Sequence, residues 1–338
     1  MFKRIAMLFL ALAIGWTIAL AGITQTPEID AKMKQLDTLR QQMANAESPE
    51  AYDVLLKKYK ALEAEIQSLM EAMKADQATR TKAITKYNEG IKDLRARRYS
   101  DAVTALQESA KLNPLEPKTF YSLGIAFQRL KKYQDALDAF TQATKLNGNY
   151  VRAHTARGLL LSRMKRLDEA VKAFQSAVAV QDASAKDRAK AFNGLGLAYH
   201  RQKNDRQAVS AYQQATNLMP EYAEAWFNMG KAYEALKDYA SAVDALKKAV
   251  EHAPKDYKYH TALAENLNKL SRFSEAASAA ARATEINANY APAWFELGWA
   301  YEHLNKSSDA IAAYQKAEKD RNYRQAAEYQ IKSIRGEF

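Results

Sequence analysis

Apolar residues in the first third of the chain follow the spacing of amphipathic helices. Thr26-Pro27-Glu28 and Ser48-Pro49-Glu50 each join an N-cap residue to a proline at the first helical position, so two helices are predicted to begin near residues 27 and 49. In the second helix, apolar residues alternate three and four positions apart over three heptads: Tyr52, Leu55, Tyr59, Leu62, Ile66, Leu69 and Met73.

The first of these helices carries a compatible apolar stripe, formed by Ile29, Met33, Leu36 and Met43 and interrupted by Arg40. Short helices of this kind need a partner surface. Two arrangements of residues 25–80 are open: a coiled coil, which allows self-association through residues 27–76, or a helical hairpin in which the two stripes pack on each other.

The N-terminus has the pattern of an export signal. Lys3 and Arg4 precede an apolar run from Ile5 to about Leu20, and Ala19-Leu20-Ala21 places small residues at a signal-peptidase site. The run also approaches the roughly 20 residues that span a bilayer. Residues 1–24 are therefore predicted to be a cleaved signal peptide, or an uncleaved anchor that keeps contact with the membrane. In both cases the rest of the chain is exported across the cytoplasmic membrane, and is periplasmic or anchored facing outward.

A second pattern, a repeat of small residues, begins near residue 83. Its first members are Gly90, Gly124, Gly158, Gly196, Gly230, Ala264 and Gly298, 34 residues apart except for one step of 38. Twelve residues after each stands an alanine: Ala102, Ala136, Ala170, Ala208, Ala242, Ala276 and Ala310. Small residues on two helices let their backbones approach closely, and large apolar residues one turn away fill the flanks. Each period is therefore predicted to be a pair of antiparallel helices, and stacking of the pairs forms a solenoid.

The period and the motif at residues 225–254, AWFNMGKAYEALKDYASAVDALKKAVEHAP, resemble the tetratricopeptide repeat (TPR) family. This resemblance implies an all-α, right-handed α-solenoid. Seven repeats are expected within 83–324, followed by a C-terminal capping helix at 325–338. The repeats are placed at 83–116, 117–150, 151–184, 189–222, 223–256, 257–290 and 291–324.

Two departures from the period are notable. The 38-residue step leaves four extra residues, 185–188, for which we expect a lengthened second helix of the third repeat or a longer loop. In the sixth repeat, His260 stands at the usual Trp position, Ala264 replaces Gly, and Ala280 replaces a Phe or Tyr. His154 also stands at the Trp position, and both histidines are expected to be packed helix residues.

Composition excludes several classes of activity. The chain has no cysteine, and its five histidines show no metal-ligand spacing. No nucleophile elbow or phosphate-binding loop is present. We expect no enzymatic activity, no catalytic residues, no cofactor and no metal site. The net charge of +11 suits a soluble basic protein rather than a disordered one. Nucleic acid is not expected, because the chain is predicted to be exported and most Tyr residues occupy structural positions.

The TPR resemblance implies that the first helices of successive repeats line a concave groove that binds a ligand. The candidate groove residues are Arg95, Lys118, Arg129, Arg152, Arg163, Lys190, Arg201, Asn193, Phe227, Asn228, Phe295 and Trp299. Repeats 1 to 4 give this groove one Arg each at the same position, and repeats 5 to 7 add Glu224, Glu234, Glu265, Glu296 and Glu302. The groove is predicted to be basic in its first half and acidic and aromatic in its second. The alternative is that these charges form solvated helix faces.

Together, these features predict a non-enzymatic scaffold that binds a protein or peptide segment, of acidic character, in the groove. An export signal, a helical segment and TPRs in this order are similar to periplasmic proteins that coordinate envelope assembly or cell division in Gram-negative bacteria. The alternative is an accessory TPR subunit of a secretion or polysaccharide-synthesis machine.

Overall fold

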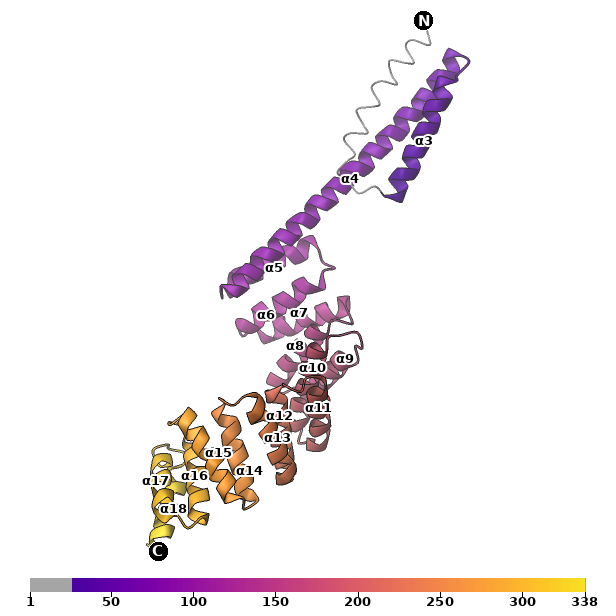
Figure 1. Cartoon of the computed structure of the whole chain (residues 1–338). Helices are drawn as coiled ribbons and strands as arrows, with labels where there is room; N and C mark the ends of the chain where they lie inside the picture. The colour runs from indigo at the N-terminus through magenta and orange to yellow at the C-terminus, as the bar shows by residue number, and fades with distance from the viewer. Residues whose placement is uncertain (1–25, 338) are drawn as a thin grey trace. The chain divides into compact units, whose positions relative to one another are not determined.

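The computed structural model describes residues 26–337, and every regular element within them is an α-helix. The predicted signal peptide or anchor lies outside the described residues. The chain divides into two compact units, one ending at Leu115 and one beginning at Glu116 (Figure 1). Among the described helices, none is both long enough and apolar enough to cross a membrane.

The first unit contains a closed helical hairpin. Helix α3 (Pro27–Ala44) and helix α4 (Pro49–Arg95) begin where the sequence predicts, and the Thr26 and Ser48 side chains accept hydrogen bonds from the amides of Ile29 and Ala51. The two apolar stripes pack on each other around buried Ile29, Leu36, Ile66 and Met70. Because this seam is closed within one chain, the hairpin is the arrangement adopted.

Helix α4 continues without interruption through residues 81–82, where the sequence suggested a border between the hairpin and the first repeat. No Pro or Gly occurs between Pro49 and Gly90 to end it. Its last turns pack against α5 (Tyr99–Leu112), and the Ser109 hydroxyl donates to the Ala83 carbonyl over 2.9 Å. One helix thus serves both the hairpin and the first helix pair, and its residues 74–82 are exposed on all sides.

The second unit is a solenoid of six helix pairs and a final helix. The first helices of the pairs are α6 (Pro117–Arg129), α8 (Val151–Arg163), α10 (Ala185–Arg201), α12 (Ala223–Ala235), α14 (Tyr257–Lys269) and α16 (Ala291–His303). The second helices are α7 (Tyr133–Leu146), α9 (Leu167–Val178), α11 (Asp205–Leu218), α13 (Tyr239–His252), α15 (Phe273–Ile286) and α17 (Ser307–Ala317), and α18 (Arg324–Arg335) covers the last pair.

The two helices of a pair cross where the repeated glycine meets a large side chain sixteen residues later. A Cβ added to Gly124 would lie 2.5 Å from the Phe140 ring, and one added to Gly230 would lie 2.7 Å from Cγ of Leu246. The pairs are Gly90–Leu106, Gly124–Phe140, Gly158–Phe174, Gly196–Tyr212, Gly230–Leu246 and Gly298–Tyr314. Glycine is therefore required at these crossings for space.

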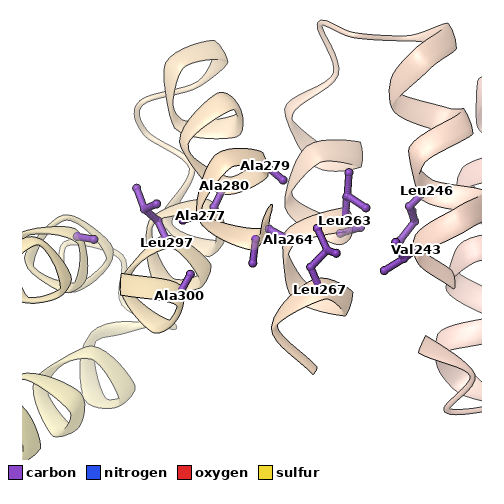
Figure 2. Close-up of a cluster of buried hydrophobic side chains, with 13 residues drawn as sticks. Val243, Leu246, Leu263, Ala264, Leu267, Ala277, Ala279, Ala280, Leu297 and Ala300 are labelled. Atoms are coloured by element: carbon purple, nitrogen blue, oxygen red, sulfur yellow. The ribbon is translucent and has the colours of Figure 1, made fainter. Parts of the chain in front are cut away.

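In the sixth repeat the first position of the crossing is larger than glycine and the second is smaller than Phe, Tyr or Leu. Ala264 and Ala280 occupy the two positions, and both are fully buried. Figure 2 shows them in a cluster that also contains Leu263 and Leu267 of α14 itself and Leu246 of the neighbouring α13. This repeat departs from the family pattern because both positions of the crossing carry small residues, and the core remains continuous there.

The histidines at the Trp position keep the hydrogen bond of the tryptophan. The indole N–H groups of Trp226 and Trp294 donate to the carbonyls of Pro220 and Ala288, six residues earlier, over 2.7 and 2.8 Å. Nε2 of His154 and of His260 lie 2.9 and 3.0 Å from the equivalent carbonyls. Both residues are buried, so the prediction that they are packed helix residues is confirmed.

The four extra residues of the 38-residue step lengthen the loop, one of the two expected outcomes, and also the next helix. The second helix of the third repeat, α9, is not lengthened; it has 12 residues and is followed by a loop at 179–184 that is longer than the other connections between repeats. The extra turn begins α10, where the Ser184 hydroxyl caps the helix by accepting from the Asp187 amide. An N-cap residue at 184 favours a helix start there.

A substitution at the small-residue crossing tests this packing. Ala280→Phe places a ring against the Ala264 methyl group and is expected to destabilise the protein by about 1–3 kcal/mol. Adding Ala264→Gly recreates the Gly124–Phe140 pair, so the double variant should recover most of the loss. Denaturant unfolding of both single variants and the double variant gives the coupling energy. Additive effects would show that the two positions do not pack against each other.

Candidate functional site

The first helices of the second unit form a surface that we call the first-helix face: those from α8 to α16 contact one another, and α6 joins them through Tyr121, whose ring lies 5.2 Å from that of Tyr150, the N-cap residue of α8. Arg201 of α10 donates to the Ser162 carbonyl of α8 over 3.1 Å. The Asn228 amide of α12 donates to Oδ1 of Asn193 of α10 over 3.0 Å. The same face continues through a Phe227–Tyr259 ring stack to α14, and through an Asn268–Glu296 hydrogen bond to α16.

Basic side chains dominate the half of this face built from α6, α8 and α10. These helices carry one acidic residue, Asp187, and nine Lys and Arg residues: Lys118, Arg129, Arg152, Arg157, Arg163, Lys186, Arg188, Lys190 and Arg201. Six of the nine are candidate groove residues, and all six are exposed. This half therefore presents a surface of positive charge.

Most of these candidate cations lack an internal counter-ion. Arg152 pairs with Asp187 over 3.2 Å, and Arg201 is engaged with the Ser162 carbonyl. No carboxylate of the described residues lies within ion-pair distance of the other four, Lys118, Arg129, Arg163 and Lys190. Their charges are available to a partner.

Arg95 is the one candidate Arg outside this surface. It is the last residue of α4, is exposed, and belongs to the first compact unit. Of the four Arg residues that repeats 1 to 4 carry at the same position, three therefore lie in the second unit: Arg129, Arg163 and Arg201, on α6, α8 and α10.

Asn193 and Asn228 form a polar link in the middle of the face. Asn193 is buried, and its amide donates to the Tyr222 hydroxyl over 3.2 Å while its oxygen accepts from Asn228. The structure brings these two candidates together. Because they bond each other, their first role is to join α10 to α12.

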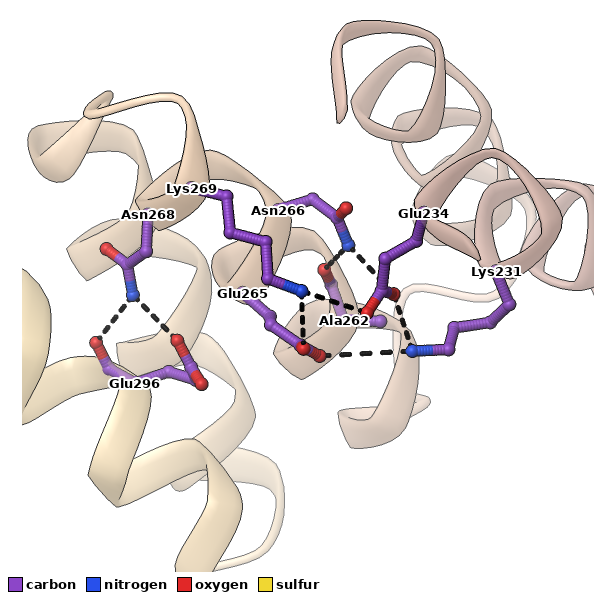
Figure 3. A network of polar contacts seen from close by, with 8 residues as sticks. All are labelled: Lys231, Glu234, Ala262, Glu265, Asn266, Asn268, Lys269 and Glu296. Atoms are coloured by element: carbon purple, nitrogen blue, oxygen red, sulfur yellow. Dashed lines mark hydrogen bonds and ion pairs between the residues drawn. The ribbon is translucent and has the colours of Figure 1, made fainter. Parts of the chain in front are cut away.

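Two of the five acidic residues of the second half, Glu234 and Glu265, are paired within the face. Glu234 lies 2.5 Å from Nζ of Lys231 and 3.0 Å from Nζ of Lys269, and Lys269 also holds Glu265 over 2.9 Å (Figure 3). Burial by itself raises the pKa of Glu234, but the hydrogen bonds from the two lysines outweigh it and lower that pKa to about 2. The charge of these two residues is thus compensated by lysines of the same helices, whereas Glu224, Glu296 and Glu302 form no ion pair with a described residue.

Glu296 of α16 is one of the three acidic residues without an ion pair, and its hydrogen-bond partner is an amide. The Asn268 amide donates to its carboxyl oxygen over 2.8 Å and to its carbonyl over 3.0 Å. Burial raises the pKa of Glu296 to about 7, although the Asn268 hydrogen bond opposes the rise. Near neutral pH this carboxyl is therefore partly protonated.

Two of the three candidate aromatic residues pack against rings of other elements. Phe227 stacks on Tyr259 of the next repeat with 4.6 Å between ring centroids and contacts the cluster around Leu246 and Leu267. Phe295 lies 5.4 Å from Tyr314 and 5.5 Å from Tyr323. Trp299 lies 4.8 Å from His303 of its own helix. Phe227 and Phe295 therefore contribute to packing, and Trp299 remains a partly exposed ring on the face.

Leu159, Asn266 and Asn268 belong to this face but were not expected from the sequence. The two asparagines are buried and bond Glu234 and Glu296, in the neighbouring helices. Leu159 leaves 47% of its surface exposed, between Arg152 and Arg163 on α8. Leu159 stands seven residues after Arg152 and four before Arg163, and this helical spacing could have predicted from the sequence that it shares their face.

The described residues contain no cluster of three or more side chains that could hold a metal ion. The face thus offers charged, polar and apolar contacts for a binding partner.

Three family models, all described as tetratricopeptide repeat, match the chain. One matches residues 150–221, the second matches 117–150 and 223–256, and the third matches 261–328. Together they span more than half of the chain. No curated protein matches it.

Solved structures show the same fold. PilF of Pseudomonas aeruginosa is 16% identical, with a TM-score of 0.55 over 65% of this chain and 96% of its own. A tetratricopeptide repeat protein from Parabacteroides merdae is 14% identical, with a TM-score of 0.53 over 75% of this chain and 99% of its own. At these identities the similarity concerns the fold alone.

The raised pKa of Glu296 predicts a pH dependence of stability. The folded state holds the proton up to about pH 7, whereas the unfolded chain releases it near the ordinary carboxyl value of 4.5. The folded state thus binds more protons, and Glu296 lowers stability as the pH rises from about 4.5 through 7. Glu296→Gln keeps an acceptor for Asn268 and should flatten this fall, with melting temperatures of both proteins measured from pH 5 to 8. Parallel curves would contradict the raised pKa.

Proposed function

Because this chain belongs to the tetratricopeptide repeat family, we propose that it is a non-enzymatic scaffold whose first-helix face binds an acidic segment of a partner protein. TPR proteins mediate protein interactions, and the observation that supports an acidic partner is the set of unpaired cations on α6, α8 and α10. Among the described residues, Lys118, Arg129, Arg163 and Lys190 have no carboxylate partner, while Lys231 and Lys269 of the second half are paired. Only the first of these two sets is free to bind.

The energies involved favour recognition by several contacts. An exposed ion pair contributes about 0–1 kcal/mol, and a charge-assisted hydrogen bond that is partly desolvated contributes about 1.5–3 kcal/mol. One Arg is therefore insufficient for stable binding. Three Arg residues at the same position of successive helices bind a segment that carries carboxylates at matching intervals, and they also speed its association.

The cellular context in this proposal comes from the N-terminal sequence. Lys3, Arg4 and the apolar run that follows support export, which places the scaffold on the outer side of the cytoplasmic membrane. A role in envelope assembly or cell-division coordination suits that location. The alternative is an accessory subunit of a secretion or polysaccharide-synthesis machine, which the same face would serve by holding another subunit.

Charge reversal tests the acidic partner. Arg129→Glu, Arg163→Glu and Arg201→Glu together are expected to abolish enrichment of acidic sequences when the full chain is used to select binders from a displayed peptide library. The repulsion of like charges acts at three successive contacts. Helicity should change little, because exposed charges contribute little to stability, and loss of the Arg201–Ser162 hydrogen bond should cost only about 0.5–1.5 kcal/mol.

A matched control changes three exposed cations of the second helices, Lys172, Arg206 and Lys316, to Glu. It makes the same change in net charge but should keep the selection of the unaltered protein. If both triple variants lose acidic binders equally, the effect comes from net charge and the first-helix face is not the binding surface. If neither loses them, the acidic partner is wrong.

The location has its own test. Protein isolated from its native envelope is expected to begin at Gly22, or to remain membrane-bound with residues 25–338 outside the cytoplasm. N-terminal sequencing and protease accessibility of spheroplasts distinguish these outcomes. Repeats that are digested only after the cytoplasmic membrane is opened would contradict export.

A further inference from the structure

A row of apolar side chains runs through the basic half of the first-helix face. Ile125, Leu159 and Leu197 occupy the same position of α6, α8 and α10. Leu159 is 47% exposed, and the other two are partly exposed. An exposed leucine alone needs no explanation, but here the same apolar position recurs on three successive helices.

Each member of the row is flanked by two cations on its own helix. Four residues later stand Arg129, Arg163 and Arg201, and seven residues earlier stand Lys118, Arg152 and Lys190. Offsets of four and seven residues place side chains on one face of a helix. The apolar row therefore lies between two rows of positive charge.

Two contacts establish that the rows of α8 and α10 are in register. Arg152 pairs with Asp187 at one end of the two helices, and Arg201 bonds Ser162 at the other. Leu159 and Leu197 lie between these contacts on their respective helices, so they are neighbours. The register makes the row a continuous strip across the two helices.

The dimensions of this strip distinguish a helical partner from an extended one. With a rise of 1.5 Å per residue, the two rows of cations lie about 6 Å and about 10 Å to either side of the apolar row. An extended strand projects side chains in only two opposite directions. A strand therefore cannot direct apolar side chains onto the row and carboxylates to both flanking rows of cations at once. A helix can, because its side chains project all around its axis.

The spacing along the strip also suits a helix. Packed helices lie about 8–10 Å apart, and two turns of an α-helix, seven residues, rise about 10.5 Å. Apolar residues seven positions apart in a partner helix would therefore reach successive members of the row.

We propose that the partner segment is an acidic amphipathic α-helix. Its apolar stripe lies on Ile125, Leu159 and Leu197, and Asp or Glu residues on both edges of the stripe meet the two rows of cations. This inference rests on the proposed function and specifies the partner of the same face. The apolar row ends at α10, because the equivalent residues of α12 and α14 are Lys231 and Glu265, so about three repeats and a helix of about 18 residues are involved.

Two synthetic peptides of identical composition test this proposal with the full chain. The first, of about five turns, has Leu at helical spacing and Glu on both edges of the stripe, and the second rearranges the same residues into strict Leu–Glu alternation. We expect the helical pattern to bind at least about tenfold more tightly by fluorescence anisotropy. Its circular dichroism should gain helix on binding. Equal affinities, or tighter binding of the alternating peptide, would overturn the helical partner.

Leu159→Asp tests the apolar row in the protein. It introduces a carboxylate into the centre of the strip and should weaken the helical peptide at least about tenfold. Val54→Asp is the matched control, because Val54 is an equally exposed apolar residue, at 54%, on the hairpin part of α4. The control should bind as the unaltered protein does. Melting curves of both variants exclude a loss of folding as the cause.

The outcomes separate this inference from the proposed function. If Leu159→Asp leaves binding unchanged while the triple Arg→Glu variant abolishes it, the face binds acidic segments but not through the apolar row. If the triple variant also leaves the helical peptide bound, the basic half is not the binding surface and both proposals fail.

Discussion

The close crossing of the two helices in each pair is the constraint on which the rest of the structure depends. A glycine on the first helix leaves no Cβ, and the Phe, Tyr or Leu sixteen residues later fills that space. A methyl group at Gly124 would overlap the Phe140 ring, so this contact determines how far apart the helices lie. Repetition of the contact every 34 residues makes successive first helices equivalent. The sixth repeat keeps the crossing with Ala264 and Ala280, which shows that the two sizes matter jointly.

This equivalence is what turns isolated side chains into a surface. Because α8 and α10 lie in register, Arg163 and Arg201 occupy matching places although 38 residues separate them. The same register brings Lys269 of α14 to Glu234 of α12. The solenoid thus distributes charge in two different ways. In α12 and α14 opposite charges meet each other across neighbouring helices, and in α6, α8 and α10 nine cations accumulate around one carboxylate, Asp187, which pairs with Arg152.

Unpaired charge has a cost for the isolated protein, because like charges repel and no carboxylate of residues 26–337 pairs with Lys118, Arg129, Arg163 or Lys190. A partner that supplies carboxylates removes this repulsion, which is why the imbalance between the two halves supports binding on the basic side. The apolar row of Ile125, Leu159 and Leu197 adds contact area that charge alone does not give. Non-directional apolar contact and directional Arg contact together make recognition both tighter and more selective.

The chain turns between the two helices of each pair in a way that the sequence does not reveal. Seven equivalent residues, Arg97, Lys131, Lys165, Lys203, Lys237, Ser271 and Asn305, adopt φ between 58° and 63°. Glycine or asparagine is the usual residue there, and only Asn305 follows that preference. Packing of the helix pair overrides the local preference of Lys and Arg, so the residue types at this position give no warning of the left-handed turn.

By itself, the sequence determined the helix pairs, their number and the position of the candidate cations, because spacing of small and apolar residues follows directly from helix geometry. It also placed the starts of α3 and α4, since the N-cap residues act locally. Tertiary structure decided the contacts between repeats. The pairs Lys231–Glu234 and Lys269–Glu265 lie three and four residues apart on one helix, a spacing that the sequence already contains. The bond from Lys269 to Glu234, 35 residues away, and the stacking of Tyr259 on Phe227 join different repeats, and such contacts exist only once the repeats are stacked.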